Sequence, residues 1–391
     1  MPEVIVEIFD TTMRDGAQAL PSDNQFENGL KPKIGDEIAK LGAGIIEAGF
    51  PATKGDAEEV SNVARTVGNT EYAVNSWFST SLESPIKKLR PPVIAGLSRT
   101  VMSDIEATWE AIEPANRPRI HTFVSTDTEH MAAKFPGKSP DEVLEMGRTA
   151  IAFARDISQH NPNSTVEFSA EAASTTHMSY LEKVVKTAID TGADVVNLPD
   201  TVGQRSPFWM HKFYSKVIEW VMETNPSVIV SSHNHNDLGL AVANSFSLVQ
   251  AAADYAQNHN ANVRTQIEST ICGLGERAGN ADIFPIMAQL FKFTPEMPVA
   301  VKWEFNPALA VSSAVAVLRH GNMSVQRQNP VVGSDINRHR SGIHSDGIIK
   351  GGYQIYTPHD PTFWGHTSSA IHEEGKYQGA NGRRHVSELN P

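Results

Sequence analysis

The sequence contains a single cysteine, Cys272, among its 391 residues, and this scarcity excludes an internal disulfide. A chain without disulfides is typical of a reducing compartment. No run of about 18 apolar residues is present, so the sequence predicts no membrane-spanning helix. The N-terminus, MPEVIVEIFDTT, enters a strand-like pattern at once and leaves no room for a signal peptide. We therefore expect a soluble, cytoplasmic protein.

Clusters of lysine and arginine are also missing. Acidic residues outnumber basic ones by 45 to 33, which gives a formal net charge of −12 at pH 7. Such a chain offers no cationic footprint for a phosphate backbone. The composition therefore argues against nucleic acid as a partner.

Short β-branched runs alternate with amphipathic helical stretches over about three quarters of the chain. Strand-like runs lie at 6–12, 44–50, 93–99, 119–126, 166–171, 194–201, 228–237 and 264–270. Strands that alternate with helices indicate βαβ units and a parallel sheet. The segment after the first run, DTTMRDG, is not the Gly-rich phosphate loop of an open doubly wound sheet. We therefore predict an α/β fold, a closed (β/α)₈ TIM barrel.

Two regions depart from this alternation. Residues 70–92 contain a strand-like stretch of their own, which we interpret as an insertion before the third barrel strand. From residue 296 a Pro-rich connector and a short helix lead into a segment rich in Gly and His. We predict a catalytic barrel over 1–295 and a C-terminal linker and subdomain, α-rich or irregular, over 296–391.

The most informative local pattern is SSHNHND. Side chains two residues apart on a strand share a face, so His233 and His235 project into the same space and form half of a divalent-metal site. Asp15, which follows the first strand, offers an oxygen ligand at the same rim of the barrel. The alternative is that one histidine is a hydrogen-bonded core residue and that Asp15 is a turn residue.

Two further patterns leave their alternatives open. Glu167, Ser169 and Glu171 alternate along one strand, where they serve either catalysis or an ion pair with a barrel arginine. The loop GLGERAGN at 273–280 is either a tight loop beside a ligand or an ordinary turn between strand and helix.

Eight motifs together carry a family resemblance. They are DTTMRDGAQ at 10–18, IEAGFP at 46–51, RIHTFVST at 119–126, VEFSAE at 166–171, NLPDTVG at 197–203, HNHNDLGLAVANS at 233–245, GLGERAGN at 273–280 and SGIHSDG at 341–347. Over residues 4–357 the sequence resembles the 2-isopropylmalate, homocitrate and citramalate synthases, a family of metal-dependent acyl-CoA condensing enzymes. SGIHSDG and the following YQIYTP are most similar to the 2-isopropylmalate synthase branch. Ala17 departs from the Glu or Asn of many relatives, and the tail beyond residue 357 diverges.

The resemblance implies a role for individual residues. Asp15, His233 and His235 match the metal ligands, and Asn280 matches a further ligand or a residue that supports them. The resemblance implies a divalent ion, which is Mn²⁺, Mg²⁺ or Zn²⁺. One aspartate and two histidines accept all three ions, so the sequence does not identify the metal.

The remaining matches concern the substrates. Arg14 matches the arginine that stabilises the developing alkoxide, and Thr201 matches the hydroxyl that holds the substrate carboxylate. His121, Ser169 and Asn197 match positions around the 2-oxo acid, and Glu171 matches a carboxylate at the reacting centre. His344 and Tyr356 match residues that reach the site of a neighbouring subunit, which implies a homodimer. Without the resemblance, His344 would be interpreted as a surface histidine in a Gly-rich loop.

By resemblance we expect an acyltransferase that converts the acetyl group of acetyl-CoA into an alkyl group on a 2-oxo acid and then hydrolyses the thioester. His344, aided by Glu171, is the expected base. 2-Oxoisovalerate, giving 2-isopropylmalate in leucine biosynthesis, is the favoured substrate, since Glu167, Ser169 and Asn197 offer no cation for the second carboxylate that a homocitrate synthase binds. A citramalate, homocitrate or other alkylmalate synthase remains an alternative, as do an acyl-CoA lyase or aldolase and a non-catalytic metal-binding relative. Because the sequence ends at Pro391, we expect no leucine-binding regulatory domain.

Overall fold

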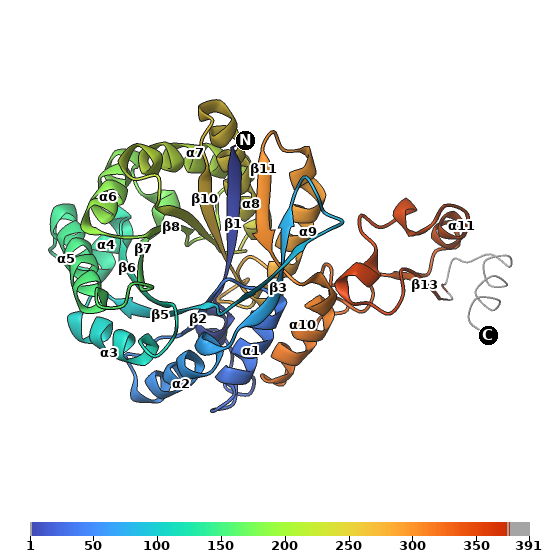
Figure 1. The fold of residues 1–391 in the computed structure, drawn as a ribbon, viewed down its shortest axis with the longest axis horizontal. Helices are drawn as coiled ribbons and strands as arrows, with labels where there is room; N and C mark the ends of the chain where they lie inside the picture. The colour runs from blue at the N-terminus through green and yellow to red at the C-terminus, as the bar shows by residue number, and fades with distance from the viewer. Residues whose placement is uncertain (1, 374, 376–391) are drawn as a thin grey trace.

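Eight parallel strands form a closed barrel at the centre of the computed structural model, which describes residues 2–373 and 375 (Figure 1). The barrel strands are β1 (Glu3–Asp10), β2 (Ile45–Gly49), β5 (Val93–Arg99), β6 (Pro118–Ser125), β7 (Thr165–Glu171), β8 (Val195–Asp200), β9 (Ile229–Asn234) and β10 (Val263–Ser269). Each strand pairs in parallel with the next, and β10 pairs with β1 to close the barrel. The predicted TIM barrel is confirmed.

Helices surround the barrel on its outside (Figure 1). They are α1 (Lys31–Leu41), α2 (Lys54–Arg65), α3 (Met102–Ile112), α4 (Thr128–Lys134), α5 (Pro140–Ser158), α6 (Met178–Thr191), α7 (Pro207–Thr224), α8 (Ala241–His259) and α9 (Ile283–Phe293). Local sequence sets their ends: Ser139 and Glu142 form a capping box at the start of α5, and Gly192 ends α6 with a left-handed φ of 111°. None of the helices in the described part of the chain is long and apolar enough to cross a membrane.

The barrel strands are buried on both faces, which is typical of a parallel sheet that is covered by helices. In β1, Val4, Val6 and Ile8 belong to the large core between the sheet and the helices. Phe9 belongs to a separate apolar cluster with Ile45, Val93 and Ala95. Since successive side chains of a strand point to opposite faces, Phe9 points into the barrel.

Residues 70–92 form an antiparallel hairpin rather than one strand. Its strands are β3 (Tyr72–Phe78) and β4 (Ile86–Arg90). β3 pairs with β11 (Ala300–Glu304), and β11 pairs in parallel with β1. Asn306 holds the hairpin to α1, because its side-chain amide donates to the carbonyls of Lys40 and Ala73.

The segment that follows the expected boundary at residue 295 remains joined to the barrel sheet. The segment that we interpreted as a Pro-rich connector contains β11, whose Val301 and Trp303 are buried on one face. After β11, helix α10 (Ala310–Arg319) still packs beside α1. The chain thus stays packed on the barrel as far as α10. Because prolines flank β11, the sequence pattern did not indicate this short strand, in which buried and half-buried residues alternate.

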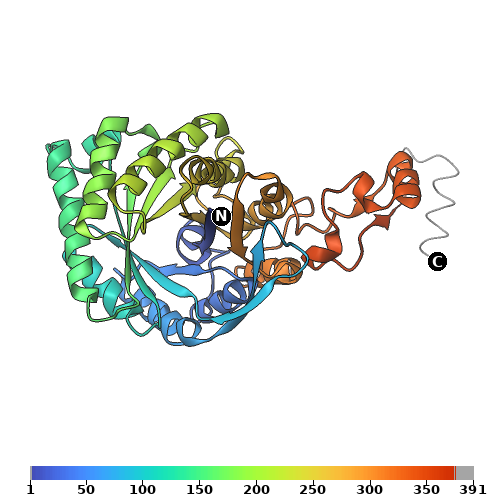
Figure 2. The same cartoon turned by 45° about the horizontal axis from the view of Figure 1, so that its top comes forward.

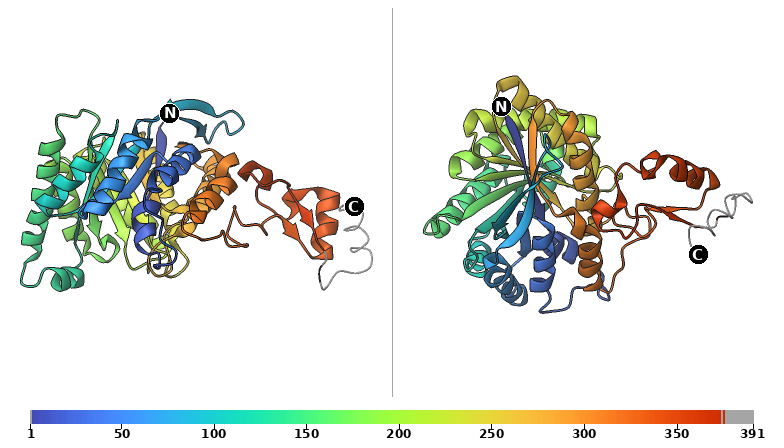
Figure 3. Two further views of the ribbon diagram at one scale, coloured as in Figure 1. Left: turned by 90° about the horizontal axis from the view of Figure 1, so that it is seen from below. Right: turned by 45° about the vertical axis from the view of Figure 1, so that its right-hand side comes forward.

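Beyond α10 the chain leaves the barrel and extends sideways from it (Figures 2 and 3). This appendage contains β12 (Arg338–His339), α11 (Gly342–Gly351) and β13 (Ile371–His372). It is anchored by Trp364, which is buried against Phe291 of α9 with ring centroids 5.6 Å apart. Residue 374 and residues 376–391 of the expected C-terminal region lie outside the described residues.

Candidate active site

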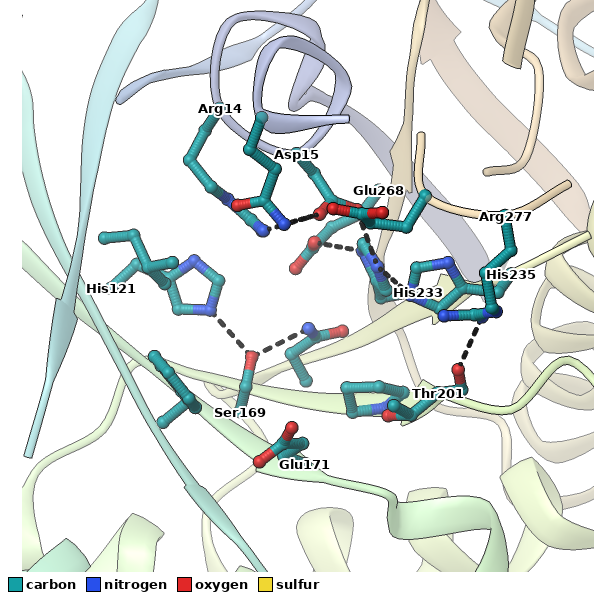
Figure 4. Close-up of a pocket in the computed structure, with 16 residues that line it drawn as sticks. Arg14, Asp15, His121, Ser169, Glu171, Thr201, His233, His235, Glu268 and Arg277 are labelled. Atoms are coloured by element: carbon teal, nitrogen blue, oxygen red, sulfur yellow. Dashed lines mark hydrogen bonds and ion pairs between the residues drawn. The ribbon is translucent and has the colours of Figure 1, made fainter. Parts of the chain in front are cut away.

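A cavity of about 280 Å³ opens at the carboxyl ends of the barrel strands (Figure 4). This is the rim at which TIM-barrel enzymes place their catalytic groups. The cavity is lined by Arg14, Asp15, Gln18, Leu97, His121, Phe123, Ser169, Glu171, Asn197, Pro199, Thr201, His233, His235, Glu268, Glu276 and Arg277. It thus brings together most of the residues that the sequence indicated.

Asp15, His233 and His235 converge on one point of this cavity. Asp15 lies in the helical turn Thr12–Gly16 after β1, His233 lies near the end of β9, and His235 follows that strand directly. One ligand atom from each lies within 4.8 Å of the others. The Nε2 atom of His233 is 3.4 Å from Asp15 Oδ2 and 3.3 Å from Nε2 of His235.

Three neighbouring side chains hold this cluster in position. Glu268 of β10 bonds Nδ1 of His233 through Oε2 at 2.7 Å, which leaves Nε2 of His233 directed at Asp15. Asn280 donates its amide to Asp15 Oδ2 at 2.8 Å, and Gln18 donates to Asp15 Oδ1 at 3.1 Å. The carboxylate of Asp15 is thus oriented from two sides.

The electrostatics of the cluster favour a positive charge between its members. Burial opposes the ionisation of Asp15, but Arg14 and then His233 lower the pKa of its carboxyl far below the usual range. Burial would lower the pKa of His233, but Glu268 and Asp15 raise it to about 10. Burial and then His233 lower the pKa of His235 to about 3, so its imidazole is neutral. A carboxylate and a neutral imidazole are the forms that bind a metal ion, so Asp15 and His235 are already in that form, whereas His233 would release its proton when an ion binds.

The donor set fits a divalent ion. Two imidazoles and one carboxylate are ligands that Zn²⁺ and Mn²⁺ accept. Nδ1 of His235 and Oδ1 of Asn280 are buried and have no hydrogen-bond partner among the residues that the structure describes. Asn280 also meets His235 through a backbone bridge, so its amide lies beside the cluster whether it acts as a ligand or as a support.

A second chain of polar contacts crosses the floor of the cavity. Arg14 donates Nε to Glu47 Oε2 at 2.5 Å and Nη1 to Asp15 Oδ1 at 3.0 Å. Glu47 also bonds Nδ1 of His121 at 2.7 Å, and Nε2 of His121 is 2.7 Å from Ser169 Oγ. Burial opposes the charge of Glu47, but Arg14 and then His121 lower its pKa to about 2. Glu47 is therefore an ionised carboxylate that positions Arg14 and His121.

The other side of the cavity carries Asn197, Thr201 and Glu171. Asn197 donates to Ser169 Oγ at 2.8 Å, and Thr201 Oγ1 accepts the backbone N–H of Ala172 at 3.0 Å. Glu171 bonds Ser125 and forms an ion pair with Lys134, the last residue of α4. Thr201 and Glu171 face the same space as the metal-ligand cluster (Figure 4).

Glu167 is not part of the cavity wall, in contrast to its strand neighbours Ser169 and Glu171. Its carboxylate lies deeper in the barrel, where it accepts Arg119 Nη1 at 3.0 Å and Gln266 Nε2 at 2.8 Å. Of the two alternatives for the alternating strand, Glu167 therefore matches the ion pair with a barrel arginine.

His344 and Tyr356 lie outside the cavity of their own chain. Both belong to the appendage, where their rings stack with centroids 3.9 Å apart. His344 is exposed, and 38% of the surface of Tyr356 is accessible. Within a single chain these two residues do not join the other site residues.

Sequence reasoning missed several residues of this cavity. Glu268 is the most important, and the polar alternation of Arg264, Gln266 and Glu268 along one strand was a usable signal. Gln18 and the apolar side chains Leu97 and Phe123 carried no such signal, because only the closed barrel brings them to the cavity.

Comparison with known proteins agrees with this fold. Residues 5–315 match the model of the HMGL-like family. The chain is 35% identical over 359 residues to a 2-isopropylmalate synthase of Halalkalibacterium halodurans, covering 90% of this chain and 61% of that one. It is 36% identical over 361 residues to the chloroplastic 2-isopropylmalate synthase 2 of Arabidopsis thaliana, covering 91% of this chain and 52% of that one. The chain therefore spans only about half to three fifths of the length of these relatives.

A solved structure shows the same architecture. The HMG-CoA lyase of Brucella melitensis superposes with a TM-score of 0.53 at 16% sequence identity, covering 81% of this chain and 97% of that one. At this identity the likeness concerns the fold alone. The family match, by contrast, extends from β1 into α10 and includes every strand that contributes to the cavity. The chain belongs to the HMGL-like family.

Proposed function

We propose that the protein is an acyltransferase that condenses the acetyl group of acetyl-CoA with a 2-oxo acid and then hydrolyses the thioester. The observation that carries this proposal is the meeting of Asp15, His233 and His235 with Arg14 on one cavity. A Claisen-type condensation needs a Lewis acid at the ketone, a cation where negative charge develops and a base for the methyl proton. The cavity offers ligands that would hold a metal ion as the Lewis acid, and Arg14 offers the cation.

Each side chain has a defined task in this reaction. Asp15, His233 and His235 would hold the divalent ion, with Asn280 beside them, and that ion supplies the Lewis acid which polarises the ketone. Arg14, held by Glu47, places its guanidinium where the ketone oxygen gains negative charge. The Thr201 hydroxyl binds the carboxylate of the 2-oxo acid.

His121, Ser169 and Asn197 form one hydrogen-bonded row at the edge of the substrate space. We propose that these three side chains orient the bound 2-oxo acid. Glu171 lies at the same cavity and assists the base, which we assign to His344 of a second copy, with Tyr356 beside it. This assignment makes the protein a homodimer with composite sites.

The cavity walls favour a monocarboxylic substrate with an apolar side chain. Leu97, Phe123 and Pro199 supply an apolar surface. Of the two arginines of the cavity, Arg14 is assigned to the ketone oxygen, and Arg277 is paired with Asp237. A second carboxylate would therefore lack a partner. We infer 2-oxoisovalerate as substrate and 2-isopropylmalate, an intermediate of leucine biosynthesis, as product.

Release of free thiol from acetyl-CoA tests this function. A panel of 2-oxoisovalerate, pyruvate and 2-oxoglutarate is added with a divalent ion, and acetyl-CoA alone is the control. We expect the highest kcat/KM for 2-oxoisovalerate. A preference for pyruvate or 2-oxoglutarate would indicate a citramalate or homocitrate synthase. Cleavage of 3-hydroxy-3-methylglutaryl-CoA without thiol release in the panel would indicate a lyase.

The metal requirement is tested separately with His235→Ala. We expect this variant to lose both the bound ion after dialysis, measured by mass spectrometry, and turnover. His211→Ala is the matched control, because His211 pairs with Asp254 outside the cavity. Full activity of the unmodified protein after exhaustive chelation would contradict the proposal.

A further inference from the structure

A second cavity lies at the opposite end of the barrel, where β1 changes its neighbour. Residues 3–5 of β1 pair with β11, whereas Phe9 and Asp10 pair with β2. The sheet therefore divides at the amino ends of these strands. The gap forms a cavity of about 220 Å³, lined by Ile5, Val6, Glu7, Ile8, Gly42, Gly44, Lys88, Arg90, Arg117, Lys302, Trp303 and Glu304.

Positive charge exceeds negative charge on the wall of this cavity. Four cations, Lys88, Arg90, Arg117 and Lys302, face two carboxylates, Glu7 and Glu304. This concentration contrasts with the net charge of −12 of the whole chain. The excess arises only in three dimensions, because its members come from β4, the segment before β6, and β11.

Both carboxylates already have partners. Glu304 accepts Lys88 Nζ at 3.2 Å and Arg90 Nε at 2.5 Å. Glu7 accepts Arg264 Nη2 at 3.2 Å, and Arg264 does not line the cavity. Neither carboxylate forms an ion pair with Arg117 or Lys302.

Among the described residues, Arg117 and Lys302 therefore have no direct ion-pair partner, although Glu7 and Glu304 attract Arg117 at longer range. Among the described residues the guanidinium of Arg117 has no hydrogen-bond partner, although its backbone carbonyl is fixed by Ile94 N–H at 3.0 Å. Lys302 lies over the ring of Phe78 at 5.3 Å. Burial and then the like charge of Arg90 lower the pKa of Arg117, yet a guanidinium remains protonated near pH 7.

We propose that this cavity is a binding site for a small oxyanion, carried by a phosphate or carboxylate group, which Arg117 binds in bidentate fashion beside Lys302. A guanidinium fork matches two oxygens of either group, and such charge-assisted bonds are the strong ones. Lys88 and Arg90 of the β3–β4 hairpin line the same cavity, so a bound anion would connect this hairpin to the barrel. The site is distinct from the catalytic cavity, because its residues lie at the amino ends of the strands.

Isothermal titration of the full chain with inorganic phosphate and with malonate tests the site and distinguishes the two ligand sources. Ionic strength is held constant with chloride. We expect saturable binding of at least one of the two anions and a loss of affinity of about tenfold or more in Arg117→Leu, from the worth of a charged hydrogen bond. Lys302→Met should weaken binding less. Arg65→Leu is the matched control for net charge, because the Arg65 side chain hydrogen-bonds Ser61 of its own helix and does not line the cavity, so this variant should bind as the unmodified protein does.

Two results would overturn the proposal. One is the absence of saturable binding of both anions to the unmodified protein. The other is equal affinity in the unmodified protein and in a folded Arg117→Leu variant, with folding checked by circular dichroism. If Arg117→Leu does not fold, the Lys302→Met variant is used for the test instead. An anion affinity of Lys302→Met equal to that of the unmodified protein would then contradict the proposal.

Discussion

Glu268 shows how one buried carboxylate controls the chemistry of the candidate metal cluster. It holds Nδ1 of His233, and so determines which ring nitrogen is directed at Asp15 and His235. Its second oxygen, Oε1, is buried, and within the described part of the chain it has no hydrogen-bond partner. The carboxylate also keeps the imidazole electron-rich, which strengthens a metal–nitrogen bond.

We predict that Glu268→Gln lowers the affinity for a divalent ion by about 10- to 100-fold, because a neutral amide no longer increases the basicity of His233. Titration calorimetry with Mn²⁺ measures this change. Glu167→Gln is the matched control, since Glu167 also lies inside the barrel but contacts Arg119 and Gln266 instead of a histidine of the cluster. Equal affinities of Glu268→Gln and the unmodified protein would show that Glu268 has no part in metal binding.

At the scale of one element, helix α9 depends on the buried Asp282. Its carboxylate caps the helix by accepting the N–H of Phe284 at 3.0 Å. Burial raises the pKa of Asp282 to about 7. Between its ordinary value near 3.8 and this value, the folded protein retains a proton that the unfolded chain has released.

This difference makes stability depend on pH. The contribution of Asp282 to stability is present at low pH and is lost as the pH rises through about 7. Asp282→Asn keeps a capping oxygen but does not titrate. We predict that the unfolding free energy of the unmodified protein, relative to this variant, falls by on the order of 1 kcal/mol or more between pH 5 and pH 8. Urea unfolding at both pH values measures it, and a constant difference would contradict the prediction.

At the scale of the whole molecule, the separation of His344 from the cavity is the central observation. His344 and Tyr356 stack on an appendage that extends away from its own barrel (Figure 3). The appendage is not loose, because Trp364 anchors it to α9. These facts support a base that acts in the barrel of a second copy.

Complementation tests this arrangement. We predict that inactive His344→Ala and inactive Asp15→Ala recover activity when mixed under conditions of subunit exchange. About a quarter of all sites should become intact, because half of the dimers are mixed and each has one complete site. A mixture of His344→Ala with Tyr356→Ala is the control: both changes lie in the appendage, so no mixed dimer has an intact site. No recovery in the first mixture despite proven exchange would mean that His344 acts within its own chain or not at all.

Much of the barrel and its site was predictable from local pattern. The eight barrel strands were all expected within a few residues, because parallel strands buried on both faces leave continuous β-branched runs in the sequence. His233 and His235 were predictable as a pair, since the two-residue period of a strand determines their common face. Asp15 and Arg14 were expected at the same rim, because every strand of a TIM barrel ends there.

What only the tertiary structure decided involves residues that are far apart in the chain. The β3–β4 hairpin and β11 are separated by more than 200 residues, and their pairing is non-local, so no local period could indicate it. The support of His233 by Glu268 and the anionic partners of Arg14 likewise depend on closure of the barrel. The sequence by itself determined the fold class and the face from which the side chains of the candidate site project, because both follow from short-range periodicity. The tertiary structure decided which charges meet and which remain unpaired, as at Arg117, because the energy of a charge depends on its neighbours in space.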